Sequence, residues 1–210
     1  MKDRIVLATG NRNKLREMRE ILKVFPLELL ALDTFPPLPE AVEDGATFTE
    51  NAVKKAAHYA ALLGLPCMAD DSGLVVEALA GRPGVFSARY AGPAATDWEN
   101  CEKLLREMDG QTNQDAYFAC VLALVAPDGQ ALTWEGRCNG RIISERRGEH
   151  GFGYDPLFLL TDTNKTLAEI PLAQKSAYSH RGEALARFMG EFQAVQVWLR
   201  ERTGHSLPAA

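Results

Sequence analysis

A long hairpin in the middle of the chain constrains the fold more than any other part of the sequence. Residues 117–126 are apolar, half of residues 131–138 are apolar, and Pro127-Asp128-Gly129 between them is a tight-turn sequence. This pattern predicts two antiparallel strands. Since other segments alternate between strand and helix, we expect a mixed α/β sheet flanked by helices.

The N-terminal segment predicts a strand, a turn and a helix. Residues 4–8 are a short apolar strand that breaks at Thr9-Gly10-Asn11, and helical spacing of apolar residues predicts a helix from near Lys14. This geometry aims backbone amides and a helix N-terminus at an anion. The spacing is not that of a P-loop, and an ordinary strand-to-helix turn has the same pattern.

The next segment predicts a second strand at 28–32 and a proline-rich acidic loop at 34–47. A helix capped by Thr49 then runs to Gly64.

Adjacent carboxylates follow this helix. Asp70 and Asp71 stand between apolar residues and Ser72-Gly73. Two like charges side by side at a strand end cost energy unless a cation compensates them. A hydrated Mg2+, held by one or two carboxylates and substrate phosphates, is a common compensation. A solvated turn with a capping aspartate is the alternative.

Three further features lie in the second half of the chain. A helix over 98–108 is capped by Thr96 or Asp97, and a glycine-rich loop at 148–156 precedes a strand at 157–160. Aromatic residues in such a loop can stack on a base or cap the core. One last helix extends to Arg202. The cationic residues at its start, Lys175, His180 and Arg181, either bind an anionic or acceptor-rich partner or are ordinary surface residues.

Composition excludes several classes of protein. Lysine and arginine total 23 against 28 acidic residues, so the net charge of −5 argues against a general nucleic-acid binder. The four cysteines and four histidines lack metal-ligand spacing. No apolar run suits a signal peptide or a bilayer, so we expect a cytoplasmic protein with no membrane association.

Together these motifs resemble the inosine triphosphate pyrophosphatase family. The matching pieces occur in the family's order from residue 9 to residue 181. They are Thr9-Gly10-Asn11 with Lys14; Gly45, Thr47-Phe48 and Glu50-Asn51-Ala52; Ala69-Asp70-Asp71-Ser72-Gly73; Pro83-Gly84 with Ser87-Ala88-Arg89-Tyr90; Gly151-Phe152-Gly153-Tyr154-Asp155-Pro156; and Lys175 with Ser179-His180-Arg181.

The resemblance implies Mg2+-dependent hydrolysis of noncanonical purine nucleoside triphosphates such as ITP, dITP and XTP to the monophosphate and pyrophosphate. It implies a homodimer and an elongated mixed β-sheet flanked by helices, with two lobes and a central active-site cleft. One such domain would span residues 1–202, followed by a frayed tail at 203–210.

The resemblance also assigns roles to residues. Asp71 would be the general base and a metal ligand, with its neighbour Asp70 as the alternative proton acceptor. The second metal carboxylate would be Glu43 or Glu40, because Val42-Glu43 replaces the adjacent acids of many members. The residues that would bind the nucleotide are Thr9, Gly10, Asn11, Arg12, Asn13, Lys14, Ser72, Phe152, Gly153, Tyr154, Asp155, Lys175, His180 and Arg181.

Two other functions fit the same residues. Paired aspartates also occur in phosphatases that form an aspartyl-phosphate, which would release inorganic phosphate. A regulatory module could bind the nucleotide without cleaving it, although a binder does not need the paired acids.

Overall fold

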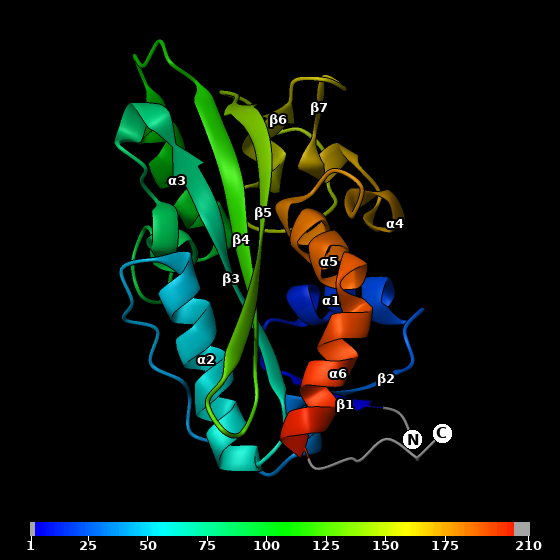
Figure 1. Cartoon of the computed structure of the whole chain (residues 1–210). Coiled ribbons are helices and arrows are strands. Elements are labelled where there is room, and N and C mark those ends of the chain that lie inside the picture. The colour runs from blue at the N-terminus through cyan, green and yellow to red at the C-terminus, as the bar shows by residue number, and fades with distance from the viewer. Residues whose placement is uncertain (1–2, 204–210) are drawn as a thin grey trace. The chain divides into compact units, whose positions relative to one another are not determined.

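The computed structural model describes residues 3–203 (Figure 1). Its strands form one mixed sheet in the order β2-β1-β3-β4-β5-β6-β7. Contacts divide the chain into two compact units, which we describe separately. Within the described residues, unit 1 comprises 3–71, 121–135 and 184–203, and unit 2 comprises 72–120 and 136–183. The predicted mixed α/β sheet is confirmed.

Unit 1 contains the predicted strand-to-helix units. Its complete elements are β1 (Asp3–Leu7), α1 (Arg12–Leu22), β2 (Leu27–Ala31), α2 (Phe48–Leu63) and α6 (Phe192–Thr203). It also contains the first part of β3 (Cys67–Val76), the end of β4 (Asp115–Val125), the start of β5 (Ala131–Ile142) and most of α5 (His180–Gly190). Strand β1 pairs in parallel with β2 and with β3. The alanines of α2 pack on apolar side chains of β1, β3 and the end of β4 to form the core of this unit.

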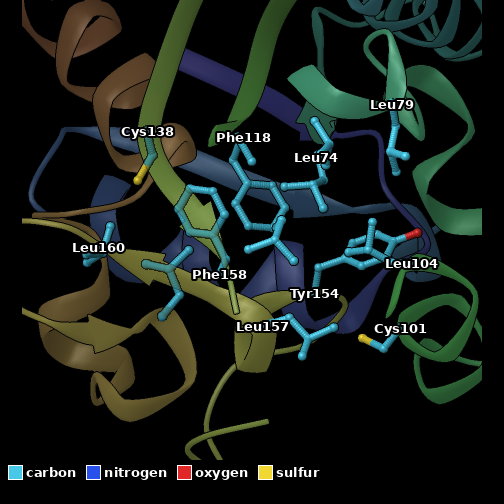
Figure 2. Packing of buried hydrophobic residues seen from close by; sticks show 14 of the residues in the cluster. Leu74, Leu79, Cys101, Leu104, Phe118, Cys138, Tyr154, Leu157, Phe158 and Leu160 are labelled. Atoms are coloured by element: carbon cyan, nitrogen blue, oxygen red, sulfur yellow. The ribbon is translucent and has the colours of Figure 1, made fainter. Parts of the chain in front are cut away.

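Unit 2 holds the ends of the hairpin strands that lie away from the turn, together with elements from before and after the hairpin. These are α3 (Asp97–Met108), β6 (Phe158–Leu160), β7 (Lys165–Thr166) and α4 (Leu172–Lys175), with parts of β4 (Asp115–Val125), β5 (Ala131–Ile142) and α5 (His180–Gly190). Strands β5, β6 and β7 pair antiparallel. Figure 2 shows the core of unit 2, where Phe118, Tyr154 and Phe158 lie among leucine side chains.

Two predicted helix starts shift by one or two residues. Helix α2 begins earlier than predicted because Thr47, not Thr49, is the N-cap and accepts the backbone N–H of Glu50. Helix α1 begins at Arg12 instead of near Lys14, because the side chain of Asn11 caps it. Thr96 caps α3 with a reciprocal bond from Glu99, as one of the two predicted caps.

The prediction of one long terminal helix was wrong. Helix α5 ends at Gly190 and α6 starts at Phe192. Glycine weakens a helix interior, and the carboxylate of Glu191 accepts the indole N–H of Trp134 at 2.9 Å. Thr203, predicted to belong to the tail, is the last residue of α6, and the rest of that tail lies outside the described residues.

The predicted strand end at the paired aspartates was also wrong. Both Asp70 and Asp71 lie inside β3, which continues without a break to Val76, and the solvated-turn alternative fails with it. The carboxylates tolerate this burial because lysine and asparagine side chains bind them, as described below. None of the helices within residues 3–203 has the length and apolar content needed to cross a bilayer.

Candidate functional site

Many of the predicted site residues, with neighbours found in the structure, form two groups, one in each unit. The acidic group lies in unit 1 and consists of Glu43, Asp70 and Asp71 with Lys14, Asn51 and Lys55. The cationic group lies in unit 2 and consists of Ser72, Phe152, Asp155, Lys175, His180 and Arg181.

The turn before α1 is held by its own side chains. The hydroxyl of Thr9 accepts the N–H of Asn11 at 3.2 Å, and the amide oxygen of Asn11 accepts the N–H groups of Asn13 and Lys14. Gly10 and Arg12 are exposed at this turn. The start of α1 therefore presents a fixed, open turn, the type of structure that binds phosphate.

The side chains of Asp70 and Asp71 lie on opposite faces of β3 and have different partners. Alternate residues of a strand point to opposite faces, and both of these side chains are buried. Lys14 lies 3.0 Å from a carboxylate oxygen of Asp70, so the predicted phosphate-binding lysine also neutralises this buried acid. The amide of Asn51 donates to Asp71 at 3.1 Å.

The environment of Asp71 changes its acidity. Burial raises the pKa of Asp71 above its ordinary 3.8, while Lys14, the Asn51 hydrogen bond and Lys55 act in the opposite direction. A carboxylate with a raised pKa accepts a proton more readily than an exposed one. This property suits a general base.

Glu43 joins this group through Lys55. The Lys55 ammonium lies 2.7 Å from a Glu43 carboxylate oxygen and donates to the backbone carbonyl of Asp70 at 3.2 Å. Burial would lower the pKa of Lys55, but Asp70, Glu43 and Asp71 raise it on balance. Glu43 also raises the pKa of Asp71, whereas Glu40 is exposed. Of the two predicted alternatives, Glu43 is the carboxylate beside Asp71.

The acidic group has the chemistry that Mg2+ requires. Within residues 3–203, no set of three or more histidine, cysteine, aspartate or glutamate side chains is arranged to hold a metal. Mg2+ keeps several waters and usually takes one or two carboxylates together with substrate phosphates. Asp71 and Glu43 fit an ion whose remaining ligands are waters or phosphate oxygens, and they do not fit a closed structural metal site.

In the cationic group, Lys175 and Asp155 form a buried ion pair. The Lys175 ammonium lies 2.7 Å from a carboxylate oxygen of Asp155, and the two side chains are 3% and 4% exposed. The same oxygen accepts the N–H of Phe152 at 2.9 Å. Asp155 therefore fixes both the lysine and the aromatic loop.

Phe152 lies near two cations. The Lys175 ammonium is 4.7 Å from the centre of its ring, and the Arg181 guanidinium is 5.8 Å from it. Arg181 is 1% exposed and donates to the hydroxyl of Ser72 at 3.0 Å. The structure thus brings Ser72, Phe152, Asp155, Lys175 and Arg181 together.

The rings of His180 and Tyr154 pack against other side chains of unit 2. The His180 ring stacks on Phe118, with 4.7 Å between ring centres. Tyr154 lies in the core of unit 2, where its hydroxyl donates to the carbonyl of Ser87 and burial raises its pKa (Figure 2). Gly153 donates its N–H to Asp97 at 2.7 Å. For Tyr154 the core-capping interpretation agrees with the geometry.

Sequence reasoning assigned no role to four residues that hold these groups, although Asn51 and Gly151 belong to the quoted motifs. Asn51 and Lys55 follow each other at i and i+4 on α2, a polar pair beside an alanine stripe, which was a usable signal. Gly151 and Gly182 are required sterically. A Cβ at Gly151 would lie 2.0 Å from a carboxylate oxygen of Asp155, and one at Gly182 would lie 1.8 Å from the carbonyl oxygen of Ser176.

Comparison with known proteins identifies the family of this chain. Residues 5–191 match the model of the Ham1 family. A dITP/XTP pyrophosphatase from Desulfotalea psychrophila is 53% identical over 205 residues, which cover 98% of this chain and 92% of that protein. A second protein of that name, from Syntrophobacter fumaroxidans, is 53% identical over 199 residues, which cover 95% and 86% of the two chains.

A solved structure is similar as well. A HAM1 protein from Coxiella burnetii superposes with a TM-score of 0.85 at 41% identity, over 91% of this chain and 99% of that chain.

Proposed function

The chain belongs to the Ham1 family, and from this premise we propose that it hydrolyses noncanonical purine nucleoside triphosphates, including ITP, dITP and XTP, to the monophosphate and pyrophosphate. The observation that carries the proposal is Asp71, a buried carboxylate of raised pKa held by Asn51 and close to Glu43. The names of the relatives support the substrate class.

The acidic group would perform the chemistry. Asp71 takes the proton from a water that attacks the α-phosphate in line with the leaving pyrophosphate, a contribution of about a hundredfold to ten-thousandfold. Lys14, Lys55 and the amides at the start of α1 bind the phosphates and offset the charge of the transition state. Asp71 and Glu43 would hold Mg2+, which when bound neutralises the phosphate oxygens.

The cationic group would select the base. Phe152 offers a ring for stacking, while Lys175, His180 and Arg181 offer donors for the 6-oxo group of hypoxanthine or xanthine. Adenine presents an amino donor at that position, which would leave donors facing one another.

The proposal extends to the biological setting. The chain would act as a homodimer in the cytoplasm with a single catalytic domain over residues 1–202, and it would remove these nucleotides before they enter DNA or RNA. Sedimentation of the purified protein tests the dimer.

The direct test is a pyrophosphate-release assay on dITP, XTP, GTP and ATP with and without Mg2+. We expect rapid release from dITP and XTP, at least about a hundredfold slower release from ATP, and no release in excess chelator. Equal rates on all four nucleotides would contradict base selection and leave hydrolysis intact. Release of orthophosphate would favour the aspartyl-phosphate alternative, and tight binding without turnover would favour a regulatory module.

A further inference from the structure

One face of α2 binds the acidic loop, which we define as residues 39–46, along most of its length. Five successive side chains of that face each hold one loop residue. The contacts are Glu50 with the N–H of Ala46 at 2.7 Å, Asn51 with the N–H of Gly45 at 2.8 Å, Lys54 with Asp44 at 2.8 Å, Lys55 with Glu43 at 2.7 Å, and His58 with the carbonyl of Pro39 at 2.8 Å.

Two of these side chains also bind strand β3. Lys55 donates to the carbonyl of Asp70, and Asn51 donates to the carboxylate of Asp71. They lie one helical turn apart, so they face the same side of α2. Lys55 brings a charge to the site, whereas Asn51 is neutral and acts only through hydrogen bonds.

The geometry around Asn51 leaves its amide one orientation. The side chain is 1% exposed. Its oxygen accepts the N–H of Gly45, and its nitrogen donates to Asp71. An asparagine turned by half a rotation would face the Gly45 N–H with a donor and the carboxylate with an acceptor. The two partners therefore fix the amide, and the amide fixes their separation.

Gly45 makes this close approach possible. A Cβ at this position would lie 2.7 Å from the amide oxygen of Asn51 and 2.8 Å from the Cβ of Glu50. Any larger residue must move either the loop or the asparagine. The distance between the acidic loop and Asp71 is thus set through Gly45 and Asn51.

We propose that Asn51 is a positioning residue that holds the Asp71 carboxylate at a fixed separation from the acidic loop carrying Glu43, so that the two acids are arranged before a divalent ion arrives. The inference rests on the proposed function and deepens it. Partners of metal ligands orient those ligands, and their loss typically costs about 10- to 100-fold in metal affinity or activity.

The test compares Asn51→Ala with Asn100→Ala. Asn100 is a matched control because it is 2% exposed, accepts the N–H of Ala91 at 2.8 Å and donates to the carbonyl of Ala88 at 3.2 Å. Each alanine variant loses two side-chain hydrogen bonds, but of the two asparagines only Asn51 binds a carboxylate. Binding of Mn2+ alone is measured by electron paramagnetic resonance, and kcat and KM are measured with dITP and Mg2+.

We expect Asn51→Ala to weaken Mn2+ binding about tenfold and to lower kcat about 10- to 100-fold, with KM for dITP within about twofold. Asn100→Ala should keep Mn2+ affinity and kcat within about twofold of the unmodified protein, although its loss of stability should be similar to that of Asn51→Ala. Equal losses in the two variants, unchanged Mn2+ binding in Asn51→Ala, or no measurable Mn2+ binding by the unmodified protein would overturn the inference.

Gly45→Ala provides a second route if Asn51→Ala does not fold. It should reproduce the weakened Mn2+ binding, while Gly190→Ala, where a Cβ would meet nothing within 4 Å, should not. Normal Mn2+ binding by Gly45→Ala would count against the inference. Failure of the unmodified protein to release pyrophosphate would instead refute the proposed function, and the substrate-free Mn2+ titrations would still decide the role of Asn51.

Discussion

The acidic group of unit 1 and the cationic group of unit 2 use opposite arrangements of charge. In the first, Glu43, Asp70 and Asp71 are bound by Lys14 and Lys55, which gives three carboxylates and two ammonium groups. In the second, Lys175 and Arg181 accompany the single carboxylate of Asp155. The first arrangement suits a further cation, and the second suits a ligand rich in acceptors.

The buried aspartates of the two groups, Asp71 and Asp155, also differ in how their burial is compensated. Asp71 is buried at an energetic cost, which its raised pKa records, and such a cost is expected where a group is needed for reaction. Asp155 is buried with a cation and a backbone donor that satisfy it. Loss of charge should therefore affect turnover in the acidic group and stability in the cationic group.

The largest effect should follow from Asp71→Asn. We expect pyrophosphate release to fall about a hundredfold to ten-thousandfold, because the proton acceptor is removed while the size of the side chain is kept. Stopped assays on dITP measure the rate, and circular dichroism checks the fold. Asp44→Asn is the control, since Asp44 is an exposed aspartate of the acidic loop and is paired with Lys54. Near-normal turnover of Asp71→Asn would remove Asp71 from the mechanism.

Much of the fold and part of this comparison follow from the sequence. The turn at Pro127-Asp128-Gly129 and the apolar runs beside it are local signals, so the hairpin and the mixed sheet could be predicted. The continuation of β3 through Asp70 and Asp71 could not, because it depends on partners distant in sequence such as Lys14 and Asn51. Local charge repulsion alone indicated a strand end.

Similar reasons explain what was missed at the site. The sequence indicates that Lys175 and Asp155 are important, but their pairing is a contact across 20 residues that no local pattern encodes. Tyr154 looked like a candidate for stacking because it lies in a glycine-rich loop, yet its ring is in the core. The steric need for Gly151 arises only from the carboxylate folded against it.

The second effect concerns stability and comes from Lys175→Met. Removing the ammonium leaves Asp155 as a buried charge without its cation, which should lower the free energy of unfolding by about 3–5 kcal/mol. Urea denaturation measures the change.

Lys175→Met with Asp155→Asn should recover most of that loss, because the amide oxygen can still accept the N–H of Phe152. Lys54→Met, which breaks an exposed pair, is the control and should leave the midpoint almost unchanged. A midpoint equally unchanged in Lys175→Met would show that the two groups do not differ in the way described.

The smallest effect is a difference in pH dependence between two acids of unit 1, Asp71 and Asp44. Burial raises the pKa of Asp71 in the folded protein above its ordinary 3.8, so its contribution to stability is present below pH 3.8 and is lost as pH rises through the raised value. Asp71→Asn lacks this loss. Its free energy of unfolding relative to the unmodified protein should therefore increase with pH above 3.8.

Asp44 should show the opposite slope. The hydrogen bond and charge of Lys54 lower the pKa of Asp44, so its contribution is present above pH 3.8 and disappears as pH falls through the lowered value. Asp44→Asn should therefore lose stability relative to the unmodified protein as pH rises. Urea denaturation in excess chelator across this range measures both slopes. Two slopes of the same sign would contradict the raised pKa of Asp71. Only an acid whose ionised form is destabilised by burial makes the protein more stable at high pH when it is replaced by a neutral amide.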